Sequence, residues 1–125
     1  MISNQILQNT IEGIKGIIKN DLCVSDAEGN TLATTSEDFS VNHEDGLSFV
    51  ASPADSQVVK GCHYFKVYDE GQLEYVIVIR GDSEEAYTIG KMIVLQIEGL
   101  LVAYKERYDK DNFIKNLLLD NLLLV

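Results

Sequence analysis

The sequence predicts a single α+β domain in which helices pack on an antiparallel sheet. Apolar residues recur at helical spacing near both ends of the chain, and two probable hairpins lie between them. Strands that are grouped in this way, rather than alternating one by one with helices, are typical of the α+β class. The chain has 125 residues, of which 46% are hydrophobic and 24% charged, as expected for one soluble core.

The first half begins with a predicted helix from Ser3 to about Asn20 and Asp21. Its isoleucines and leucine keep helical spacing, at Ile6, Leu7, Ile11, Ile14, Ile17 and Ile18. A first hairpin follows, because residues 22–24 and the β-branched run 31–35 flank the turn-rich residues 26–30.

The middle of the chain contains a link and a second hairpin. The polar residues 36–44 lead into a short helical or irregular segment at 47–51, which ends before Pro53. Alternation over 63–68, a turn at 69–72 and the apolar run 73–80 then predict two strands. The second of these strands is apolar enough to lie in the centre of the sheet.

A long helix is predicted from Ser83 to the end of the chain, because this stretch contains no proline. Its first half is expected to face the core through Met92, Ile93, Leu95, Ile97, Leu100, Leu101 and Tyr104. After a charged interruption, apolar residues cover most of the helix circumference. We therefore expect residues 1–108 to form the domain and residues 109–125 to begin a connector with dimer contacts at Phe113, Ile114, Leu117, Leu118 and Leu122.

The net charge of −10 opposes direct contact of this chain with nucleic-acid phosphates and with anionic membranes. We expect a cytoplasmic protein without a membrane span, because no basic and apolar leader begins the sequence and Asp120 and Asn121 interrupt the terminal leucines. Cys23 and Cys62 are expected to be thiols inside strands rather than a disulfide.

Four parts of the sequence carry a family resemblance: the run 22–33, the pair His43-Glu44, the strand 75–79 and above all the segment 109–125. Together they resemble the N-terminal domain of sugar-diacid-type (CdaR/PucR-like) transcriptional regulators. The resemblance implies a PAS-like antiparallel sheet with an N-terminal helix and a long C-terminal connector helix. It also implies that DNA is bound only by a C-terminal helix-turn-helix domain, which lies outside this chain.

The resemblance implies a small-molecule effector, such as a sugar diacid or another carboxylate. Family members carry an arginine shortly before the His-Glu pair, whereas this chain has the acidic run 36–40, which would repel a diacid. The remaining positive candidates are Lys60, Lys66, Arg80 and the two histidines, and the residues assigned to ligand binding are His43, Lys60, His63, Tyr64 and Arg80. Structural alternatives are a surface or capping role for His43, a rim ion pair for Arg80 and core packing for the tyrosine.

Two functional hypotheses follow. In the first, a metabolite binds between the sheet and the polar 36–63 segment and the long helix transmits the signal. In the second, the domain binds no ligand and forms a homodimer through the 113–125 surface, with the first helix as a further contact. An enzyme is the least favoured class, because no nucleophile with a neighbouring base is evident, and neither a metal site nor a cofactor is predicted.

Overall fold

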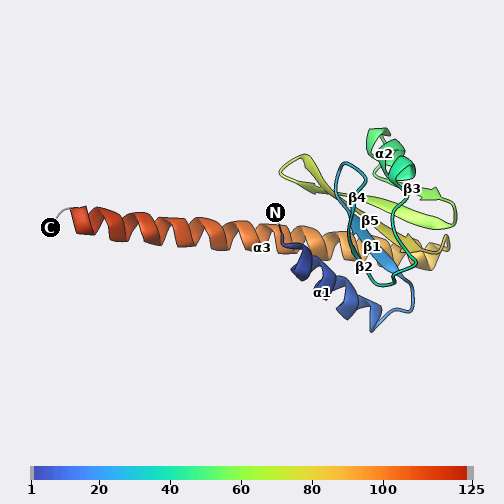
Figure 1. Cartoon of the computed structure of the whole chain (residues 1–125), viewed down its shortest axis with the longest axis horizontal. Coiled ribbons are helices and arrows are strands. Elements are labelled where there is room, and N and C mark those ends of the chain that lie inside the picture. The colour runs from blue at the N-terminus through green and yellow to red at the C-terminus, as the bar shows by residue number, and fades with distance from the viewer. Residues whose placement is uncertain (1, 124–125) are drawn as a thin grey trace.

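The computed structural model describes residues 2–123, and in its last helix the side chains of 108–109, 111–113 and 116–123 lie outside the description. The elements are α1 (Asn4–Lys15), β1 (Leu22–Ser25), β2 (Thr31–Thr34), α2 (His43–Ala51), β3 (Ser56–Val59), β4 (Cys62–Asp69), β5 (Gln72–Arg80) and α3 (Glu84–Leu123). The five strands pair antiparallel in the order β2-β1-β5-β4-β3. The predicted α+β class, with an N-terminal helix and a long C-terminal helix, is confirmed (Figure 1).

The helix α1 starts where the sequence predicts it and ends earlier. Ser3 is the N-cap, and its Oγ accepts a hydrogen bond from the backbone N–H of Ile6 at 3.3 Å. The helix ends at Lys15 with Gly16 as its C-cap, so the predicted extension to Asn20 is wrong. Glycine is a poor helix former, and the chain turns there although Ile17 and Ile18 continue the helical spacing. As a consequence, the Ile17 side chain is 87% exposed.

The two predicted hairpins are present, and β5 is the central strand. Asp26 organises the first turn, since its Oδ1 accepts hydrogen bonds from the backbone N–H groups of Glu28 and Asn30, both at 2.9 Å. The central strand β5 lies between β1 and β4. It is buried on both faces of the sheet along most of its length, which explains its continuous apolar run.

The link between the hairpins is more regular than predicted. The helix α2 begins already at His43, because Asn42 is its N-cap and accepts a hydrogen bond from the backbone N–H of Asp45 at 3.0 Å. The edge strand β3 follows and pairs with β4, and the sequence analysis missed it. Its middle residues Gln57 and Val58 are exposed, so it lacks the alternating burial by which half-buried strands are recognised.

The two faces of the sheet carry different layers. The face toward α1 and α3 holds the larger core, which includes Leu22, Val24, Phe65, Val67, Tyr75, Ile77, Ile79, Ile93, Ile97 and Leu101. The opposite face lies under α2 and the loop before it, and its cluster comprises Cys23, Phe39, Val41, Phe49, Tyr64, Val76 and Val78. Successive residues of β4 and β5 alternate between these two clusters, as the pleat of a strand requires.

The helix α3 packs on the sheet with its first half and continues beyond the domain (Figure 1). Ser83 caps it, its Oγ accepting a hydrogen bond from the backbone N–H of Ala86 at 3.1 Å. Of the residues predicted to face the core, Ile93, Ile97 and Leu101 are buried. The prediction is wrong for Met92 and Leu95, which are 65% and 70% exposed, because they lie on the side of α3 that points away from the sheet.

Candidate functional site

The candidate site is the face of the sheet that α2 covers. Tyr64 on β4 lies at its centre, and its ring meets the ring of Phe49 on α2 edge to face, with centroids 5.6 Å apart. Phe49 and Gly46 are the buried residues of α2, so this short helix rests on the sheet mainly through one aromatic side chain. The aromatic ring of Tyr64, which carries a hydroxyl group, therefore lies beneath the short helix α2.

Lys66 is a buried cation on the same face. Its residue is 7% exposed, its Nζ donates a hydrogen bond to the backbone carbonyl of Ser52, and the amine lies 5.1 Å from the centroid of the Phe49 ring. Among the described residues no carboxylate lies within ion-pair distance of this amine. Ser52 is the C-cap of α2, so Lys66 interacts favourably with the negative end of that helix dipole. Lys66 is one of the positive candidates in the sequence, although it is not among the residues assigned to ligand binding.

Arg80 lies at the end of β5, on the rim of this face. Its Nη1 is 3.3 Å from Oδ2 of Asp21, and its guanidinium lies 4.5 Å from the centroid of the Phe39 ring. The side chain is 48% exposed. Its contact with Phe39 joins the rim of the sheet to the loop that precedes α2.

Lys60 and Asp45 meet at the other end of α2. The Lys60 Nζ lies 3.0 Å from Asp45 Oδ2, and the Lys60 side chain is 73% exposed. That carboxylate oxygen is buried and accepts no hydrogen bond from any described residue, so the geometry of the pair is that of a charge contact alone.

The two histidines do not join Tyr64. His43 is the first residue of α2, is exposed, and holds its Nδ1 3.4 Å from the carbonyl oxygen of Gly29. His63 lies on the opposite face of the sheet, where its Nε2 is 2.9 Å from the carbonyl oxygen of Ser83 and its ring packs against Tyr87. The sequence-predicted site residues thus fall on two faces, with Lys60, Tyr64 and Arg80 on the α2 side.

Burial controls the protonation of this face. Desolvation raises the pKa of Tyr64 to about 12, with further contributions from Asp45 and the two cysteines. Burial likewise raises the pKa of the Cys23 thiol to about 12, aided by Cys62 and opposed by Arg80. Both groups are neutral at physiological pH and cannot act as nucleophiles there, whereas the lysine and arginine side chains supply positive charge.

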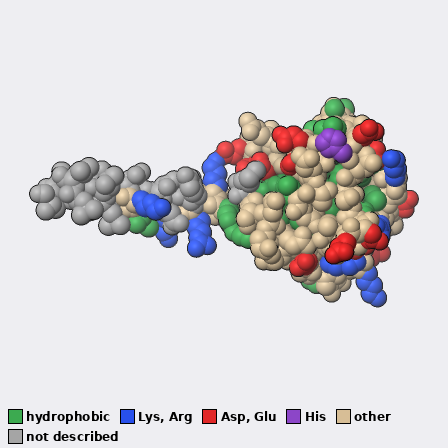
Figure 2. Space-filling model, viewed as in Figure 1, with side chains coloured by type: hydrophobic (Ala, Val, Ile, Leu, Met, Phe, Trp, Pro, Cys, Tyr) green, Lys and Arg blue, Asp and Glu red, His purple; other side chains and the backbone are tan. Residues whose placement is uncertain are grey.

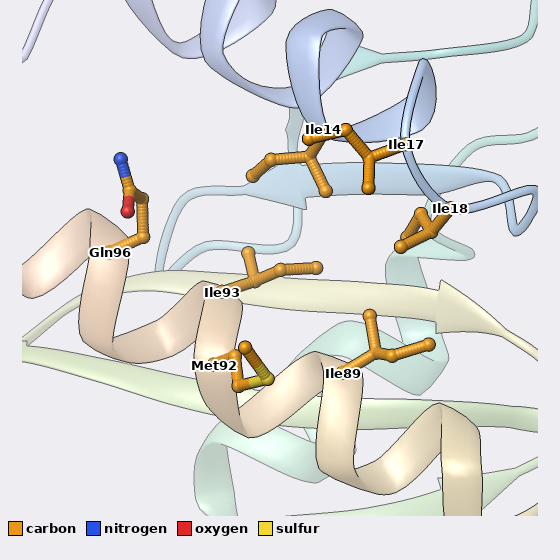
Figure 3. A pocket seen from close by; sticks show the side chains of 7 residues that line it. All are labelled: Ile14, Ile17, Ile18, Ile89, Met92, Ile93 and Gln96. Carbon is orange, nitrogen blue, oxygen red and sulfur yellow. The ribbon is translucent and has the colours of Figure 1, made fainter.

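Two hollows lined by described residues lie away from α2. One, of about 260 Å³, lies between the end of α1 and α3 and is lined by Ile14, Ile17, Ile18, Ile89, Met92, Ile93 and Gln96 (Figure 3). The other, of about 340 Å³, lies beside the β4–β5 turn and is lined by Tyr68, Asp69, Glu70, Glu98, Val102, Lys105 and Glu106. Within the described residues, no group of three histidine, cysteine, aspartate or glutamate side chains is placed to hold a metal ion.

Of the predicted dimer contacts, Ile114 is described and is 44% exposed. The side chains of Phe113, Leu117, Leu118 and Leu122 lie outside the described residues. One helical stretch, Glu84–Arg107, is long and apolar enough by length and composition to cross a membrane, which is weak evidence because core helices of soluble proteins pass the same test. In its most apolar window, a third of the residues are buried inside this domain.

Comparisons with family models, curated proteins and solved structures found no match for this chain. Its placement among sugar-diacid-type regulators therefore stays a prediction.

Proposed function

We propose that this chain is the sensory domain of a transcriptional regulator and binds a small carboxylate on the α2 face of the sheet. One observation carries the proposal: Lys60, Lys66 and Arg80 each contact the segment 39–52 that covers this face. The chain as a whole carries a net charge of −10, and acidic side chains are spread over the face seen in Figure 2. Lys60 and Arg80 are already paired with Asp45 and Asp21, so the amine of Lys66, which has no carboxylate partner among the described residues, is the group that favours an anionic ligand there.

The cover is suited to ligand entry. The α2 helix has nine residues, of which Gly46 and Phe49 are buried. Segments with few buried apolar contacts open at lower free-energy cost than the core of a domain. A carboxylate ligand would replace the Ser52 carbonyl as the hydrogen-bond acceptor of the Lys66 amine. The amine would then donate to a charged acceptor instead of a neutral one, and the end of α2 would lose one of its contacts.

The strand β4 links this face to α3. Tyr64 and Lys66 point toward α2, while their neighbours His63 and Phe65 point toward α3. His63 contacts the carbonyl of Ser83 at the start of α3, and the Phe65 ring lies against Gly90, about two helical turns further on. A shift of β4 on ligand binding therefore changes how α3 packs on the sheet. This helix has 40 residues and extends beyond the domain.

The DNA-binding step is proposed to belong to a helix-turn-helix domain outside this chain, in the cytoplasm. The net charge of −10 makes this domain itself a poor partner for DNA phosphates. The chain is accordingly proposed to act as a regulator by signalling, and no catalytic step is assigned to it.

A dimerisation module without a ligand is the second candidate. The cluster of Tyr64, Phe49 and their neighbours is packed, and the two hollows described above lie elsewhere. Apolar side chains on the outer side of α3 are exposed, among them Met92 and Leu95. These observations favour a domain whose function is to form a homodimer.

A thermal-shift screen with small carboxylates, sugar acids and nucleobase-related compounds separates the two candidates. A ligand present at 100 times its dissociation constant stabilises the folded state by about 2.7 kcal/mol, which raises the melting temperature measurably. We expect a dose-dependent rise for the wild type, and a loss of that rise in Lys66→Met and Arg80→Ala relative to each variant's own baseline.

Lys105→Met is the matched control, since Lys105 on α3 pairs with Glu70 in the β4–β5 turn and does not contact the segment 39–52 through this pair. This variant removes the same charge and should keep the ligand response. No rise in the wild type across the panel would favour the dimerisation module. A rise that Lys66→Met and Arg80→Ala both retain would place the ligand elsewhere.

A further inference from the structure

The outer side of α3 carries an apolar stripe, formed by Met92, Leu95, Gly99 and Val102. Met92, Leu95 and Val102 are 65%, 70% and 55% exposed, and a Cβ on Gly99 would meet nothing within 4 Å. The members are separated by three, four and three residues, which is the a/d spacing of a coiled-coil seam. This side of α3 faces away from the sheet, so the domain itself does not cover it.

An apolar groove of about 260 Å³ adjoins the stripe. In Figure 3 the isoleucines at the end of α1 point toward Ile89, Met92 and Ile93 on α3. Gln96 is the one polar side chain among the seven that line the groove, and Ile17 stands 87% exposed at its edge. Stripe and groove form one continuous surface through Met92, which belongs to both.

We propose that a second copy of this chain covers this surface, with the two α3 helices packed along the Met92–Val102 stripe. In a coiled coil, the apolar residues of one helix pack against those of a partner helix that has the same spacing. The α3 helix of a second copy has this spacing, because its sequence is the same. In the sequence, the next two positions of the same spacing are Glu106 and Asp109, so the apolar seam ends at Val102.

Charge also favours a copy of this chain over an anionic membrane. The stripe from Met92 to Val102 contains no charged residue, although the chain carries −10 overall. Two copies can therefore meet here without placing like charges in the seam, and Gly99 lets the two backbones approach closely. The inference goes beyond the proposed ligand function, since the seam is built on the side of α3 that faces away from the candidate site.

Sedimentation equilibrium of the whole chain tests the seam. We expect the wild type to be a dimer and Leu95→Glu to weaken dimerisation at least about tenfold, because it places two carboxylates in an apolar contact. Val58→Glu is the matched control: Val58 is 50% exposed on the edge strand β3, so it adds the same charge to an exposed apolar position outside the seam. Circular dichroism checks that both variants keep the fold.

Oxidation of Met92 by hydrogen peroxide gives a test on the wild type. The Met92 side chain is 65% exposed in the single chain, so the proposal expects oxidation to be slow in the dimer and to approach the rate of free methionine on dilution. A monomeric wild type, a Leu95→Glu variant that dimerises as tightly as the wild type, or a concentration-independent fast oxidation of Met92 would each overturn it. Flotation of a monomeric wild type with neutral phosphatidylcholine vesicles would instead assign the surface to lipid.

Discussion

Gly90 on α3 lies directly against the ring of Phe65 on β4. A Cβ placed on Gly90 would come within 3.0 Å of three carbon atoms of that ring, closer than Cβ atoms come to other groups in proteins. Phe65 is buried in the larger core, next to His63, which contacts the start of α3. The absence of a side chain at Gly90 therefore sets how closely the long helix approaches the sheet.

Replacing Gly90 with alanine should destabilise the domain by about 1–3 kcal/mol, because the added methyl group displaces a packed aromatic ring. Urea unfolding followed by circular dichroism measures the change. Gly13→Ala in α1 is the matched control, since its Cβ would meet nothing within 4 Å and alanine is the better helix former by about 1 kcal/mol. Equal stabilisation by both substitutions would contradict the close contact.

Tyr75 ties the N-terminus to the central strand, and Tyr75→Phe should lower stability by about 1–2 kcal/mol. Its hydroxyl accepts a hydrogen bond from the backbone N–H of Ile2 at 3.1 Å and donates one to the Ile2 carbonyl at 3.3 Å, in a buried position. Tyr68→Phe removes an exposed hydroxyl that contacts Asp55 and should change stability little. Chemical denaturation measures the free energy of unfolding of the two variants. Equal losses of stability in both variants would contradict this prediction.

Asp21 should give the domain a pH-dependent stability. A hydrogen bond from Lys15 holds the pKa of Asp21 below 3.8, desolvation opposes the shift, and Thr35 and Arg80 add to it. Because the folded pKa is depressed, the stabilisation is fully present above 3.8 and is lost as the pH falls through the lowered value. Asp21→Asn should therefore be less stable than the wild type at neutral pH, and the two should converge in strong acid. A difference in unfolding free energy that is constant with pH would rule this out.

The two thiols should react at different rates. Burial raises the pKa of Cys23 to about 12, whereas Cys62 is half-buried at the start of β4. Iodoacetamide at mildly alkaline pH should modify Cys62 first, with peptide mass spectrometry reporting each site. Both thiols should react alike in urea, so a faster reaction of Cys23 in the folded chain would show that the α2 face opens more readily than its packing indicates.

Much of the fold could be predicted from local patterns. Capping by Ser3 and Ser83, the Asp26 turn and the apolar run of β5 each act over a few residues and are visible in the sequence. The edge strand β3 was missed because its burial does not alternate, so only its pairing with β4 defines it. Met92 and Leu95 were assigned to the core because the apolar part of α3 is wider than the face that the sheet can cover.

The candidate site was harder to predict, because its members meet only in three dimensions. His63 and Tyr64 are neighbours in the sequence, yet the pleat of β4 sends them to opposite faces. Lys66 shares a face of the sheet with Tyr64, as their spacing of two residues along β4 predicts. Its burial and its contact with the Ser52 carbonyl depend on where α2 comes to rest, which no local pattern specifies.

Amide hydrogen exchange tests the central claim most directly, namely that a carboxylate bound under α2 changes the state of α3. The experiment compares the chain alone with the chain saturated by whichever screened carboxylate raises its melting temperature most. The account predicts altered exchange in α2, over residues 43–51, together with altered exchange in α3 beyond Leu101. Changes confined to the groove between α1 and α3, or a response in α2 that leaves α3 unchanged, would contradict it.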